Sequence, residues 1–143
     1  MNTEIYMEMT LFFDNDFNVY KIEKILGMKP TECKRQGETR MSPFDKTKHL
    51  EGYWTLRSET FHEWDIKPLI DNMIFKIKGK IENIKELCEK NNGEVHFEIV
   101  PKFKPDSLPA IYFEREFLHI VHQLDATIDI DMYCESENFR KEL

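Results

Sequence analysis

Carboxylate and imidazole side chains recur at alternate positions in two stretches of the sequence. Asp129 and Asp131 are separated by one residue near the C-terminus, and His96 and Glu98 repeat that spacing upstream. Side chains of a β-strand alternate between its two faces, so each pair would project from one side of a sheet. Carboxylate oxygens suit hard divalent cations, and an imidazole widens the choice to transition metals. The same pattern also describes an ordinary solvated sheet face.

The elements that would position these residues follow from hydrophobic periodicity. Apolar residues at every second position predict strands at residues 5–13, 53–57, 95–100 and 127–134. Apolar residues at helical spacing predict helices at residues 19–26, 66–87 and 114–124. Gly79 is a place where the longest helix could break in two, because glycine weakens a helix interior. In the second strand, Trp54 and Leu56 are expected to face the core.

These elements predict one α+β domain over residues 1–134, with a long loop at 31–52 and a frayed C-terminal tail at 135–143. Both halves read strand, helix, strand, which favours a ferredoxin-like split β-α-β fold. We therefore expect a mostly antiparallel four-stranded sheet, helices on one face and an additional long helix between the halves. The competing topology is a parallel sheet with crossover helices. Alternation on all four strands favours a sheet that is covered on one face only.

In the ferredoxin-like arrangement, the face away from the helices collects polar side chains from all four strands. The candidate cluster on this face comprises Glu8, Arg57, His96, Glu98, Asp129 and Asp131. It could be a metal-binding carboxylate–histidine cluster, a solvated face balanced by arginine, or a face that packs on another subunit. The ligands would come from distant segments, and no local spacing supports a metal. We therefore predict no metal and no cofactor, and favour the solvated or interface interpretation.

No catalytic residue is predicted. The sequence lacks the glycine-rich phosphate loops, H-E-x-x-H, G-x-S-x-G and C-x-x-C. Three cysteines, Cys33, Cys88 and Cys134, form neither a disulfide framework nor a zinc signature, and reduced thiols fit a cytoplasmic location. No signal peptide or membrane span is expected from the sequence.

The net charge of the chain limits the kinds of partner that it is expected to bind. The formal net charge is −7, from 27 acidic and 20 basic residues. A diffuse acidic balance argues against nucleic acid and anionic membranes as partners, because those surfaces attract basic proteins. It is compatible with a basic protein partner.

Several short motifs resemble those of a family of small bacterial domains of unknown function. They are the L-G-x-x-P element from Leu26 to Pro30, a lone Gly37, the W-x-L strand at Trp54 and the closing I-D-x-D-x-Y strand that begins at Ile128. The resemblance covers nearly the whole chain and implies one intact domain, without an established activity. Some small acidic bacterial proteins of this kind look like immunity partners of secreted toxins.

Two hypotheses from different classes follow. In the first, the chain is a non-enzymatic domain that binds a protein partner, with toxin neutralisation as one version. In the second, it is an enzyme or a small-ligand or metal sensor that uses the polar sheet face, with the 31–52 segment as a lid. The sequence leaves the oligomeric state open.

Overall fold

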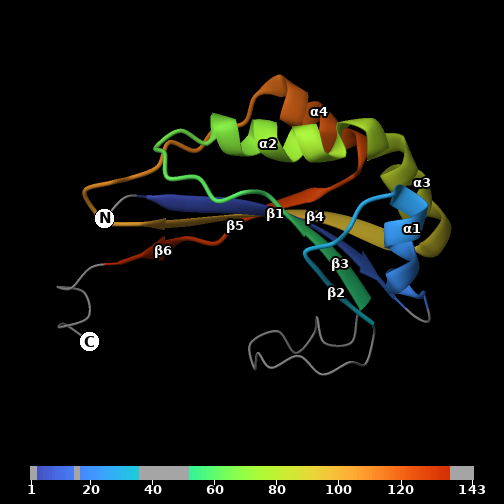
Figure 1. Cartoon of the computed structure of the whole chain (residues 1–143). Helices are drawn as coiled ribbons and strands as arrows, with labels where there is room; N and C mark the ends of the chain where they lie inside the picture. The colour runs from blue at the N-terminus through green and yellow to red at the C-terminus, as the bar shows by residue number, and fades with distance from the viewer. Residues whose placement is uncertain (1–2, 15–16, 36–51, 136–143) are drawn as a thin grey trace.

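Strands and helices are interspersed along the chain in an α+β arrangement (Figure 1). The computed structural model describes residues 3–14, 17–35 and 52–135. In chain order the elements are β1 (Glu4–Phe13), the short 3-10 helix η1 (Val19–Lys21), α1 (Ile22–Leu26), β2 (Glu32–Lys34), β3 (Gly52–Arg57), α2 (Lys67–Ile77), the short 3-10 helix η3 (Lys78–Lys80), α3 (Ile81–Asn91), β4 (Gly93–Phe103), α4 (Arg115–Gln123), β5 (Thr127–Ile130) and β6 (Tyr133–Cys134).

The strands form one mixed sheet in the order β2-β3-β1-β4-β5, with β6 paired to β4. The pairs β2–β3, β3–β1 and β1–β4 are antiparallel, whereas β5 and β6 run parallel to β4. The expectation of four strands was therefore too low. The sheet gains β2, and the expected last strand is divided into β5 and β6.

The central strand β1 shows the alternation that the sequence predicted. Its buried residues are Ile5, Met7, Met9, Leu11 and Phe13, each at most 1% exposed. Trp54 and Leu56 of β3 also lie in the core, as expected. Burying a large apolar side chain contributes about 1.5–3 kcal/mol. The buried face of the sheet therefore contributes much of the stability of the fold.

The helices α2, α3 and α4 lie on one side of the sheet (Figure 1). The apolar stripe from Ile66 to Leu87 packs into the same core as β1. Its expected break at Gly79 is present: α2 ends at Ile77, and α3 begins at Ile81 after the short helix η3. Two helices thus replace one long helix. None of the helices in the described ranges is long and apolar enough to cross a membrane.

Pro101 lies inside β4, where the sequence predicted the start of a loop. Its register partner on β1 is Ile5, whose N–H and C=O both bond to Phe61, so nothing on that side requires an N–H from Pro101. On the other side of β4, Asp131 donates its N–H to the carbonyl of Ile99. A parallel ladder would continue with an N–H from Pro101, which proline lacks. The missing donor explains why the edge strand is divided between β5 and β6.

The segment predicted as a loop at 31–52 is partly strand. Glu32–Lys34 forms β2 and pairs with residues 53–55 of β3. Cys33 is therefore a half-buried strand residue and not a loop residue. The remainder of that predicted loop, at 36–51, and the predicted tail at 136–143 lie outside the described residues.

Candidate functional site on the open face of the sheet

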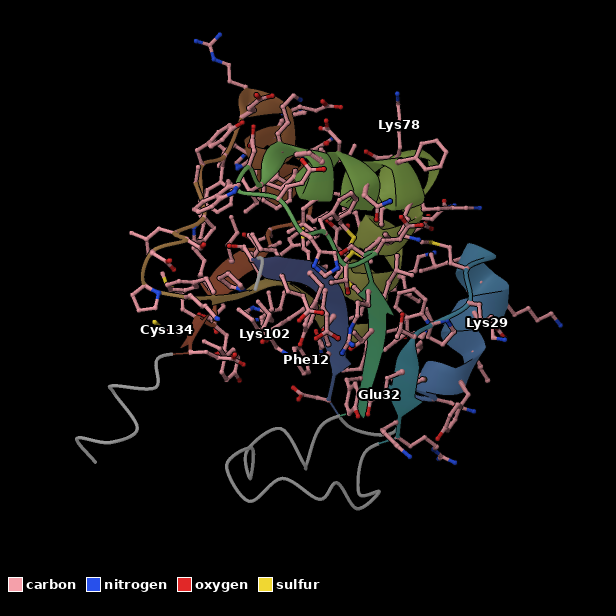
Figure 2. The ribbon with its side chains drawn as sticks, turned by 60° about the vertical axis from the view of Figure 1, so that its left-hand side comes forward. Phe12, Lys29, Glu32, Lys78, Lys102 and Cys134 are labelled. Atoms are coloured by element: carbon pink, nitrogen blue, oxygen red, sulfur yellow. The ribbon has the colours of Figure 1, made fainter. Side chains whose placement is uncertain are left out.

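We call the side of the sheet opposite α2, α3 and α4 the open face. On β1 it carries Tyr6, Glu8, Thr10 and Phe12, which alternate with the buried core residues. Phe12 and Lys102 lie on the side of the sheet away from α2 (Figure 2). Within the described ranges, the buried residues of the helices belong to the core on the other side.

A row of charged side chains crosses four strands of this face. Glu8 is the register partner of Arg57 on β3 and of Glu98 on β4, and Glu98 is the partner of Asp129 on β5. Arg57 Nη2 lies 3.5 Å from Glu8 Oε2. We call Glu8, Glu98 and Asp129 the carboxylate row. The structure thus brings together four of the six residues that the sequence nominated.

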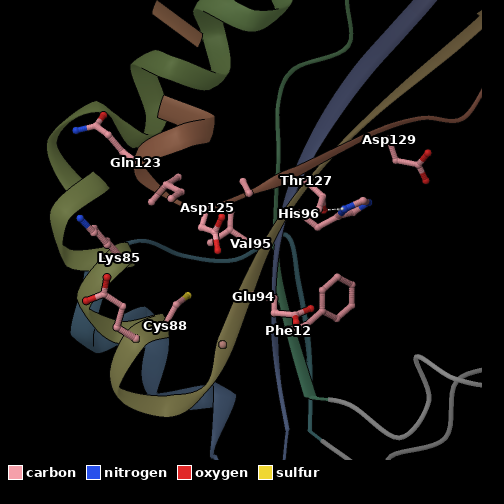
Figure 3. A pocket seen from close by; sticks show the side chains of 14 residues that line it. Phe12, Lys85, Cys88, Glu94, Val95, His96, Gln123, Asp125, Thr127 and Asp129 are labelled. Atoms are coloured by element: carbon pink, nitrogen blue, oxygen red, sulfur yellow. Dashed lines mark hydrogen bonds between the residues drawn. The ribbon is translucent and has the colours of Figure 1, made fainter. Parts of the chain in front are cut away.

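His96 lies beside this row. It is the register partner of Thr10 on β1 and of Thr127 on β5. Its Nδ1 is 2.6 Å from Thr127 Oγ1, a hydrogen bond that fixes the orientation of the ring (Figure 3). His96, Glu98 and Asp129 each offer one potential ligand atom, and these three atoms lie within 4.8 Å of one another. The fifth nominated residue therefore belongs to the cluster.

Asp131, the sixth nominated residue, lies in the connection between β5 and β6. Its Oδ2 accepts a hydrogen bond of 2.9 Å from the Tyr133 hydroxyl. That bond, with the negative charge of Asp131, raises the pKa of Tyr133 above its usual range. Asp131 is not a member of the group formed by His96, Glu98 and Asp129.

Tyr6 is a residue of this face that the sequence analysis missed. The Arg57 guanidinium lies 4.4 Å from the centre of its ring, within the range of a cation–π interaction. Burial raises the pKa of Tyr6, Arg57 opposes that shift, and the charges of Glu8, Glu98 and Asp131 add to it. The charges of the nominated residues therefore act on the Tyr6 phenol. Its position two residues before Glu8 was the available signal.

A groove of about 800 Å³ lies beside the cluster, between the sheet and the helices α3 and α4. His96, Thr127 and Asp129 line it from β4 and β5, and Lys85 and Gln123 line it from the helices (Figure 3). Cys88 also contributes to the wall. Burial raises the pKa of the Cys88 thiol to about 12, so this sulfur remains protonated near neutral pH and is a poor nucleophile.

The family of the chain was identified by comparison with family models. The family described as "Domain of unknown function (DUF4279)" matches residues 3–135. The chain belongs to the DUF4279 family. That match includes every described strand and every residue of the nominated cluster. No curated protein and no solved structure matches the chain.

Proposed function

We propose that this DUF4279 domain is a non-enzymatic binding protein whose open face docks a basic surface of a protein partner. The observation that carries the proposal is the carboxylate row, which places three acidic side chains in register on adjacent strands with Arg57 at one end. Asp131 adds a fourth carboxylate nearby, and it is exposed like Asp129, whereas Glu8 and Glu98 are half-buried.

Electrostatics supports a basic partner. Because Arg57 lies beside Glu8, its positive charge is at the β3 end of the row, and the β5 end carries Glu98 and Asp129. Complementary charge raises association rates and selects against acidic partners. The net charge of −7 adds a long-range attraction toward a positively charged partner.

Aromatic side chains on the same face could anchor the contact. Tyr133 is 49% exposed beside Asp131, and Tyr6 is half-buried beneath Arg57. Tyrosine and arginine are enriched among the residues that dominate binding free energy at interfaces. The open face therefore combines an acidic field with residue types suited to tight contacts.

Toxin neutralisation is the concrete version of this function that we favour. A nuclease toxin needs a basic site to hold the phosphates of its substrate. An acidic sheet face could cover such a site and would compete with nucleic acid through the same charges. In this version, the immunity-type protein acts by occlusion.

We also infer that the framework is ferredoxin-like. The antiparallel order β2-β3-β1-β4, with α1 between β1 and β2 and with α2 and α3 between β3 and β4, fits the split β-α-β pattern. Strands β5 and β6 then extend this framework at the β4 edge. Strand β5 adds Asp129 to the open face, and the connection between β5 and β6 adds Asp131.

Photo-crosslinking in the source cells tests the docking surface. Benzoylphenylalanine would replace Tyr133 on the open face or, as the matched control, Phe75, which is 82% exposed on α2. We expect Tyr133→benzoylphenylalanine to crosslink to a protein through a basic segment and the Phe75 variant not to do so. Crosslinks from the Phe75 position alone would contradict the proposal.

Binding of the purified crosslinked partner then tests the role of charge. Asp129→Lys should weaken the complex at least tenfold, mainly through slower association, because it reverses the field of the open face. Glu82→Lys, on the exposed side of α3, makes the same charge change in the helical layer and should have little effect. The reverse ranking would place the interface on the helices.

A further inference from the structure

We propose that His96, Glu98 and Asp129 form a binding site for a divalent transition-metal ion, with Zn²⁺ as the best fit. One imidazole nitrogen and two carboxylate oxygens are a common set of zinc ligands. The proposal does not depend on the docking function, because it concerns the isolated protein.

The backbone directs all three side chains to one place. His96 and Glu98 are two residues apart on β4, and Asp129 is the register partner of Glu98 on the adjacent parallel strand β5. Their potential ligand atoms lie within 4.8 Å of one another. Tetrahedral zinc, with bonds of about 2.0–2.1 Å, needs ligand atoms roughly 3.3 Å apart. In the proposed site, rotation of the Glu98 and Asp129 side chains would bring the ligand atoms to that spacing.

Thr127 supplies a second, independent observation. Histidines that bind metals usually donate their other ring N–H to an oxygen, which fixes the ring and its tautomer. The 2.6 Å hydrogen bond between His96 Nδ1 and Thr127 Oγ1 takes this form in the tautomer that carries the proton on Nδ1. With the proton on Nδ1, the lone pair on Nε2 becomes the ligand.

The surroundings favour a cation at this end of the row. Glu8 is the neighbour of Glu98 on β1, and Arg57 is on the far side of Glu8 from the proposed site. The carboxylates of Glu98 and Asp129 would both attract a divalent ion placed between them. The groove beside Asp129 gives an ion access and leaves coordination positions for water.

Calorimetric titration of the purified, chelator-treated full chain tests the site. With Zn²⁺ as the titrant, we expect one ion per chain at micromolar affinity. Asp129→Asn and His96→Gln should each weaken binding at least tenfold. The controls are Asp131→Asn, which is outside the cluster, His122→Gln on α4 and Cys134→Ser, and each should retain the affinity of the parent.

The two threonines that flank His96 give a sharper comparison. Thr127→Val removes the orienting hydrogen bond and should reduce zinc affinity roughly 10–100-fold. Thr10→Val is the matched control, because Thr10 is also a register partner of His96 but bonds to Thr55 instead. Circular dichroism and urea midpoints would verify that all variants fold. The absence of stoichiometric binding in the parent, or equal affinity in the parent and in Asp129→Asn, would overturn the proposal.

Discussion

Glu98 and Asp129 are register partners on the parallel strands β4 and β5, so two carboxylates share one end of the open face. They are 31 positions apart in the sequence, and only the parallel pairing brings them together. Asp129 is exposed, and one of its oxygens accepts a hydrogen bond of 3.1 Å from the Ile130 backbone N–H. Water therefore solvates much of the negative charge of Asp129.

The first prediction concerns the stability of this end of the sheet without metal. Replacement of both Asp129 and Asp131 by Asn should change the free energy of unfolding by no more than about 0.5 kcal/mol, because both side chains are exposed. The small relief of like-charge repulsion makes slight stabilisation the expected direction. Urea unfolding in the presence of a chelator is the measurement. A loss of several kcal/mol would mean that these carboxylates hold the fold together.

The second prediction concerns the titration of two tyrosines. Tyr133 donates to Asp131 at 2.9 Å, and Tyr112 donates to Asp65 at 2.8 Å. The pKa of each phenol is raised, chiefly by that hydrogen bond. Asp131→Asn should lower the pKa of Tyr133 toward its usual value and leave that of Tyr112 unchanged. NMR titration of tyrosine labelled at the hydroxyl-bearing ring carbon resolves the two groups.

The raised pKa values of Tyr133 and Tyr112 determine how the free energy of unfolding changes with pH. A raised pKa in the folded state means that the tyrosine's contribution is fully present below the unfolded pKa and is lost as the pH rises through the folded value. Unfolding free energy should therefore decline in the alkaline range, and Tyr133→Phe should reduce that decline. A steeper alkaline decline in Tyr133→Phe than in the parent would contradict the sign.

The core and the polar face were predictable because alternation is a local property. The side chains of Glu8 and Glu98 were assigned to the open face from their neighbours in the sequence alone. Trp54 was assigned to the core in the same way. Tyr6 follows the same alternation as Glu8, so the sequence also assigns it to the open face. It was not nominated because the nominated residues are all acidic, basic or histidine.

The pairing of strands was less accessible. Three residues of β2 are too few to show a period, and all three are half-buried. Pro101 indicated a loop, and only the bonds between Ile5 and Phe61 explain why a strand tolerates it. The contact between His96 and Thr127 likewise depends on which strand lies beside β4. These features are decided by contacts between distant segments.

Trp54 provides the third prediction. Its side chain is fully buried, and within the described part of the chain its Nε1 has no hydrogen-bond partner. Trp54→Ala should destabilise the protein by about 3–5 kcal/mol through the cavity it leaves. Trp54→Phe should cost only about 1–2 kcal/mol, because it keeps an aromatic ring and removes an unpaired buried donor. Urea midpoints measure both, and equal losses would contradict the role assigned to the ring.

The fourth prediction concerns thiol reactivity. Cys88 is buried with a pKa of about 12, whereas Cys134 is exposed. Iodoacetamide reacts with the thiolate, so the folded protein should be alkylated at Cys134 and spared at Cys88. In concentrated urea, Cys88 should become modified. Mass spectrometry of peptides identifies the labelled site, and fast labelling of Cys88 in the native protein would mean that α3 opens readily.

The last prediction concerns the junction between α3 and β4. Gly93 is the register partner of Phe13, and a Cβ at Gly93 would overlap the Phe13 ring. Phe13 is 1% exposed and stacks on Phe17 with ring centroids 4.5 Å apart, so the ring has little room to move away. Gly93→Ala should therefore destabilise the protein by about 1–3 kcal/mol, as overpacking does.

A double-mutant cycle separates this overlap from a loss of backbone freedom. In a Phe13→Leu background, the smaller side chain leaves space for the new methyl group, so Gly93→Ala should cost much less. Gly79→Ala is the control, because a Cβ there meets no atom within 4 Å and η3 is an exposed turn between helices. Equal costs for Gly93→Ala in both backgrounds would show that the Phe13 ring is not what requires glycine at this junction.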